Sequence, residues 1–94
     1  MTPTHPFITL TTDFGTRDPF VGLMKAQILE RCAAAHIVDL SHEIPPFAPA
    51  TAGFWWRLCH PFFPAGTLHI GVVDPGVGTE RRLLLAEGAD QLLL

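Results

Sequence analysis

The stretch "PFITLTTDFGTRDPFVGLMKAQILERCAA", residues 6–34, decides the fold of this chain. Residues 6–13 are rich in Ile, Leu and Thr, a composition that predicts a β-strand. After the turn "FGTR", Asp18 and Pro19 suit an N-cap and a first helical residue, so a helix is predicted over 18–34. Its apolar residues recur at spacings that form one helix face: Val21, Met24, Ile28 and Leu29.

The rest of the chain repeats this alternation of strands and helices. A second strand is predicted over 36–40, a proline-broken loop over 41–51, a second helix over 49–60 and a third strand over 66–74. The segment 81–94 predicts a strand, a glycine-containing turn and the start of another strand. This order predicts a Rossmann-like, three-layer α/β domain with a mainly parallel sheet and right-handed crossovers.

Composition limits the class of protein. The 94 residues make one domain (1–94), and 48% hydrophobic residues with 16% charged residues argue against disorder. A net charge of −3 without a basic run argues against nucleic-acid binding. No apolar run reaches the roughly 20 residues of a membrane span, and the N-terminus has no signal-peptide pattern. We therefore expect a cytoplasmic protein whose two cysteines are reduced.

The chain ends in "LLL" (92–94), an apolar strand without a polar cap. This ending predicts that the sequence is cut within an element. The alternative is a short terminal strand that pairs in a hairpin and stops.

Three predicted strands end in an acid: Asp13, Asp39 and Asp74. Ligands of open parallel sheets bind beyond the carboxyl ends of the strands. Asp13 and Asp74 are each followed by a glycine-containing corner, so as a pair they are candidates to bind a sugar diol, hold a cation or act as a base. For either acid alone, an Asx-turn or a helix cap explains it equally well. Asp39 is explained by a bond to the neighbouring turn, and Asp18 by capping.

Arg81 and Phe47 complete the set of candidates. Arg81 follows Asp74 by seven residues, and a loop of that length can return its guanidinium to the carboxylate to favour a deprotonated water. The alternative is an exposed arginine beside Arg82. Phe47 stands on a proline-stiffened loop, where its ring can stack on a flat ligand or simply pack against the loop.

Several chemistries lack their motifs. The histidines and cysteines have no metal-ligand spacing, and no nucleophile elbow occurs. The segment "PGVGTER" lacks the third glycine of a dinucleotide fingerprint. We therefore expect no metal and no NAD or Walker-type nucleotide site.

Three segments in order carry a family resemblance: "ITLTTDFGTRDPFVGLMKAQIL", "IVDLSHEIPPF" and "FPAGTLHIGVVDPGVGTERR". Together they resemble the N-terminal domain of the adenosine-forming S-adenosylmethionine hydrolases, or SAM hydroxide adenosyltransferases, which are related to fluorinase and chlorinase. The resemblance implies attack of water or hydroxide on the ribose 5′ carbon of S-adenosylmethionine, which yields adenosine and methionine. S-adenosylmethionine is then the substrate, and no cofactor is needed.

The resemblance also implies roles for individual residues. Asp74 and Arg81 match the family's catalytic Asp and Arg, whereas the family's catalytic His comes from beyond residue 94. Asp13 matches the residue that accepts hydrogen bonds from the ribose hydroxyls, Phe47 an apolar contact to the nucleoside and Asp18 a contact to the methionine end. The halogenases carry a tyrosine where this chain has Asp74, which favours hydrolysis over halide transfer.

Family members are more than twice this length, add a C-terminal β-barrel domain and form homotrimers with the active site between subunits. The resemblance therefore implies that this chain is an incomplete N-terminal α/β domain. Two alternatives stay open: a non-catalytic fragment that binds nucleosides or serves assembly, and a halogenase-like adenosyl transferase.

Overall fold

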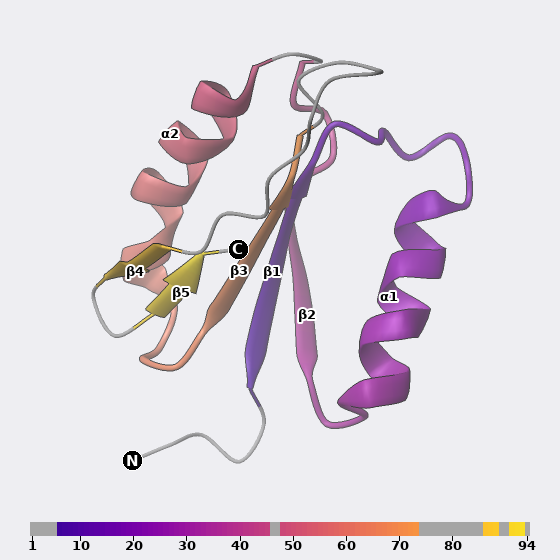
Figure 1. The fold of residues 1–94 in the computed structure, drawn as a ribbon, viewed down its shortest axis with the longest axis horizontal. Helices are drawn as coiled ribbons and strands as arrows, with labels where there is room; N and C mark the ends of the chain where they lie inside the picture. The colour runs from indigo at the N-terminus through magenta and orange to yellow at the C-terminus, as the bar shows by residue number, and fades with distance from the viewer. Residues whose placement is uncertain (1–5, 46–47, 74–85, 89–90, 94) are drawn as a thin grey trace.

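The computed structural model describes residues 6–45, 48–73, 86–88 and 91–93, and in them a five-stranded sheet of order β2-β1-β3-β5-β4 (Figure 1). The strands are β1 (Phe7–Thr12), β2 (His36–Ser41), β3 (Leu68–Val72), β4 (Ala86–Gly88) and β5 (Gln91–Leu93). Strands β2, β1, β3 and β5 are parallel, and β4 pairs with β5 in the antiparallel sense. The predicted mainly parallel sheet and the two strands expected in the segment 81–94 are thereby confirmed.

Two helices cover the sheet from opposite sides, α1 (Phe20–Arg31) and α2 (Pro49–Cys59) (Figure 1). The strand order explains this arrangement. The connection from β1 to β2 runs one way along the sheet and that from β2 to β3 runs back across β1, so two right-handed crossovers place their helices on opposite faces. The predicted three-layer α/β domain is confirmed. In the described part of the chain, no helix has the length and hydrophobicity to cross a membrane.

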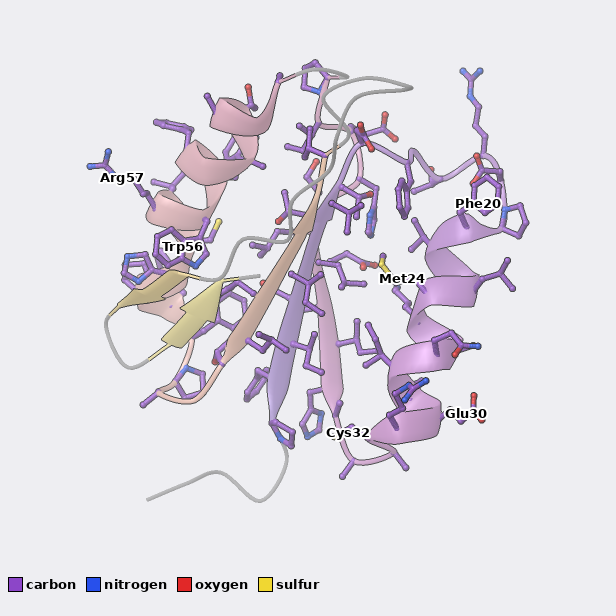
Figure 2. The ribbon with its side chains drawn as sticks, in the orientation of Figure 1. Phe20, Met24, Glu30, Cys32, Trp56 and Arg57 are labelled. Atoms are coloured by element: carbon purple, nitrogen blue, oxygen red, sulfur yellow. The ribbon has the colours of Figure 1, made fainter. Side chains whose placement is uncertain are left out.

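Alternate residues of β1 face α1 and form the core on that side. Ile8 and Leu10 are buried, Leu10 completely, and Val21 of α1 is buried with them. Figure 2 shows Met24 pointing from α1 toward the sheet and Glu30 pointing away from it. The prediction that Leu29 shares this face is wrong, because Leu29 is 41% exposed.

The position of Leu29 follows from its neighbours on α1. It lies one turn after Lys25, whose ammonium pairs with Asp39 at the edge of the helix–sheet contact. The apolar stripe of α1 is therefore narrow, and Leu29 lies outside it.

A β-bulge interrupts the pairing of β1 with β2. Leu10 lies opposite Asp39, but the next residue, Thr11, lies opposite Ser41, so Leu40 is an extra residue in β2. An extra residue offsets the alternation of side chains along a strand. Asp39 and His42, three residues apart, can therefore reach each other on one side of the sheet.

The face toward α2 carries a buried polar pair. Thr9 Oγ1 lies 2.6 Å from His69 Nδ1, and both residues are at most 1% exposed. The rings of Trp56 and Phe63 meet the His69 ring edge-on. Trp56 is thus the inward member of three consecutive aromatic residues of α2, while its neighbours Phe54 and Trp55 are 61% and 39% exposed.

Candidate functional site

The carboxyl ends of β1 and β3 lie side by side. Thr12 and Val72 are in register, and the backbone N–H of Asp13 donates to the Val72 carbonyl at 3.2 Å. From β1 the chain continues to β2 on one flank, and β3 lies on the other, so this edge is the point where the strand order reverses. Ligands of open α/β sheets bind in the crevice at such a point. The structure therefore confirms that Asp13 lies at the edge where a ligand site is expected.

Asp13 sits in a tight turn that its neighbours hold. Thr12 Oγ1 accepts a hydrogen bond from the Phe14 N–H at 3.1 Å, and the Gly15 N–H donates to the His42 carbonyl at 2.7 Å. Gly15 has a φ of 70°, a conformation that favours glycine. A Cβ there would come no closer than 4.0 Å to Glu43, so backbone conformation rather than space requires the glycine.

A chain of side-chain hydrogen bonds runs from this turn to α1. His42 is 5% exposed, and its Nδ1 lies 2.7 Å from Thr12 Oγ1 while its Nε2 lies 2.8 Å from Asp39 Oδ1. The other carboxylate oxygen of Asp39 accepts from Lys25 Nζ at 2.7 Å. Strands β1 and β2 and helix α1 are thus joined through four polar side chains.

The surroundings of Asp39 favour its ionised form. Partial burial acts to raise the pKa of this carboxyl, but hydrogen bonds from Lys25 and His42 and the positive charge of Lys25 outweigh it and hold the pKa below its usual value. Asp39 was expected at a strand end, yet it lies within β2 with two strand residues after it. The alternative role, a bond to the neighbouring turn, is confirmed by its contact with His42.

Asp18 was predicted as the N-cap of α1, but it lies one residue before the N-cap and still binds the start of the helix. The helix begins at Phe20, with Pro19 in the N-cap position, and Asp18 Oδ1 accepts from the Phe20 N–H at 3.1 Å. Asp18 is exposed in the loop that leads from Asp13 to α1. Its expected contact with the methionine end of the substrate stays a prediction.

The other predicted site residues, Asp74, Arg81 and Phe47, lie outside the described residues. The site is therefore built here from Asp13 and the edge between β1 and β3. A carboxylate on such an edge can accept hydrogen bonds from both hydroxyls of a ribose. Within residues 6–45, 48–73, 86–88 and 91–93, no group of three His, Cys, Asp or Glu side chains is arranged to hold a metal ion.

Sequence reasoning missed His42. Its position three residues after Asp39 offered one signal, but a regular strand would send the two side chains to opposite faces. The bulge at Leu40, which brings them together, leaves no pattern in the sequence.

Comparison with known proteins adds independent evidence. Residues 8–94 match the family described as SAM hydroxide adenosyltransferase N-terminal domain. A curated relative from Methanocaldococcus jannaschii, named (R)-S-adenosyl-L-methionine hydrolase, is 43% identical over 85% of this chain and 32% of its own length. A fluorinase from an Actinoplanes species is 31% identical over 83% of this chain and 26% of its own.

A solved structure agrees with the fold. An uncharacterized conserved protein from Thermotoga maritima superposes with a TM-score of 0.83 and 34% identity, over 92% of this chain and 33% of that one. The chain thus spans about a third of the length of the relatives it matches. On the strength of the matched residues 8–94 and the 43% identity, this chain belongs to the SAM hydroxide adenosyltransferase family, to whose N-terminal domain it corresponds.

Proposed function

We propose that the intact protein hydrolyses S-adenosyl-L-methionine to adenosine and L-methionine. The observation that carries this proposal is the junction of β1 and β3, where Asp13 is hydrogen-bonded to Val72, two residues before Asp74 in the sequence. Asp13 follows β1 directly and Asp74 follows the last residue of β3 by two positions in the sequence, which supports assigning both acids to one site. Relatives named (R)-S-adenosyl-L-methionine hydrolase, at 34% to 43% identity, support the same reaction.

The sulfonium is a good leaving group, so catalysis depends mainly on activating the water nucleophile. Attack of water on the ribose 5′ carbon forms a C–O bond and breaks the C–S bond, and the sulfonium leaves as the neutral thioether of methionine. The water must be held in line with the C–S bond and lose a proton. We assign these tasks to Asp74, assisted by the positive charge of Arg81.

The remaining candidates bind the substrate. Asp13 accepts hydrogen bonds from the ribose hydroxyls, Phe47 contacts the nucleoside and Asp18 the methionine end. No resident metal or cofactor is required, because the sulfonium already activates the carbon. We further propose that the intact protein is a cytoplasmic homotrimer, as the family resemblance implies.

A second candidate function is nucleoside binding without catalysis. It is favoured by the fact that the chain spans about a third of the length of its relatives. The family resemblance also implies that the catalytic histidine comes from outside these 94 residues. Calorimetry separates the two candidates, since this one predicts adenosine binding without any turnover of S-adenosylmethionine.

Halide transfer is the less favoured chemistry. Relatives named fluorinase are more distant, at 31% and 28% identity. A carboxylate at position 74 also repels an incoming halide anion. This alternative predicts a halogenated nucleoside when chloride or fluoride is supplied.

The test is the release of adenosine from S-adenosylmethionine by the intact protein, followed by chromatography. Asp74→Ala should abolish release, because no group then orients and deprotonates the water. Glu30→Ala is the matched control, since Glu30 points away from the sheet on α1 (Figure 2). Normal turnover by Asp74→Ala would remove Asp74 from the mechanism.

A further inference from the structure

We propose that His42 and Thr12 are a pair of positioning residues that hold the Asp13 turn, residues 12–15, in the conformation that receives the ribose. The inference rests on the proposed function, because it takes Asp13 as the ligand of the ribose hydroxyls. Neither His42 nor Thr12 needs to touch the substrate. They act on it through the backbone on either side of Asp13.

The hydrogen-bond partners fix which atoms donate. The Asp39 carboxylate can only accept, so His42 Nε2, 2.8 Å away, carries a proton. In the neutral imidazole Nδ1 is then an acceptor, and the Thr12 hydroxyl, 2.7 Å away, donates to it. The same hydroxyl oxygen keeps its lone pairs free to accept the Phe14 N–H at 3.1 Å. In this tautomer both the Thr12 hydroxyl and the His42 Nε2–H donate to an acceptor.

The backbone ties the same two segments together a second time. The Gly15 N–H donates to the His42 carbonyl at 2.7 Å, and the Ile44 N–H donates to the Thr12 carbonyl at 3.2 Å. Residues 42–44 therefore hold the Asp13 turn by backbone hydrogen bonds at both of its ends, Thr12 and Gly15.

Because Thr12 and His42 are buried, their hydrogen bond favours a single rotamer of the Thr12 side chain. Thr12 is 0% and His42 5% exposed, so water does not replace a lost partner. Rotation of the Thr12 hydroxyl away from His42 would leave a buried nitrogen unpaired and would also release the Phe14 N–H. His42 thus selects the Thr12 rotamer, and Thr12 fixes the amide that follows Asp13.

The test uses Thr12→Val, which removes the hydroxyl and keeps the shape of the side chain. In the intact protein, calorimetry should show adenosine affinity lowered about two- to tenfold, the loss expected for one net hydrogen bond. Exchange of the Phe14 amide, followed by NMR, should become faster by about tenfold or more. Thr12→Ser, which keeps the hydroxyl, should restore both properties, and His42→Leu should behave like Thr12→Val.

The chain offers a matched control on the same strand. Thr9→Val removes another buried Thr–His hydrogen bond, the 2.6 Å contact of Thr9 Oγ1 with His69 Nδ1 on the opposite face of the sheet. It should lower stability to a similar extent while leaving adenosine affinity and Phe14 exchange unchanged. A merely structural role for Thr12 predicts the same effects from both substitutions.

Two results would overturn the inference. One is unchanged Phe14 exchange and adenosine affinity in Thr12→Val, and the other is an equal loss in Thr9→Val. If the unaltered protein does not bind adenosine, the proposed function fails instead. Phe14 exchange in Thr12→Val and Thr12→Ser then still decides whether the pair holds the turn.

Discussion

At the scale of single residues, the carboxylate of Asp39 is the acceptor on which the hydrogen bonds from α1 to the Asp13 turn depend. It accepts from Lys25 on α1 and from buried His42, and this pairing assigns the imidazole tautomer. The position of Asp13 after β1 was predictable, because Asp13 follows a clear run of strand-forming residues. The partner of Asp39 was not, since it depends on a bulge that propensities do not encode.

The lowered pKa of Asp39 predicts a dependence of stability on acid pH. A carboxyl with a pKa lower in the folded than in the unfolded chain, where it is about 3.9, stabilises the fold above that pH. This contribution is lost as the pH falls through the lower, folded pKa. Asp39→Asn should therefore be less stable than the unaltered chain at pH 7, and the difference should shrink below about pH 4.

Urea unfolding between pH 7 and pH 3 measures this difference. Glu30→Gln controls for the loss of one negative charge on α1, because Glu30 points away from the sheet (Figure 2). If the difference in free energy of unfolding between Asp39→Asn and the unaltered chain stays constant down to pH 3, folding does not lower the pKa of Asp39.

At the scale of elements, β1 is the strand on which the fold and the site both depend. It lies between β2 and β3, contributes the fully buried Leu10 and delivers Asp13 to the edge of the sheet. The strands and both helices were predictable from hydrophobic periodicity and from proline and glycine positions. The 3₁₀ helix η1 (His60–Phe62) was not predicted, because the expected second helix ended at residue 60 and no element was expected before residue 66.

Truncation of the core should confirm the central place of β1. Leu10→Ala removes a completely buried side chain and should lower the free energy of unfolding by about 2–5 kcal/mol. Leu29→Ala makes the same chemical change at a residue that is 41% exposed and should cost less than about 1 kcal/mol. Equal losses in urea titrations would mean that the packing of α1 on β1 is wrongly described.

At the scale of the whole molecule, alternation of strands and helices was enough to predict the three-layer α/β architecture. The order β2-β1-β3 was not predicted, although it is what joins the ends of β1 and β3. Sequence also could not tell which apolar residues face outward: Phe20, Leu23, Phe54, Leu58 and Phe62 are all more than half exposed. Orientation of such residues depends on packing between elements, and not on their own hydrophobicity.

The most direct measurement is a crystal structure of the intact protein grown with adenosine. We predict the ribose at the carboxyl edge of β1 and β3, with its hydroxyls hydrogen-bonded to the Asp13 carboxylate and its 5′ carbon facing Asp74. Adenosine bound at another edge of the sheet, or bound here without contact to Asp13, would contradict it.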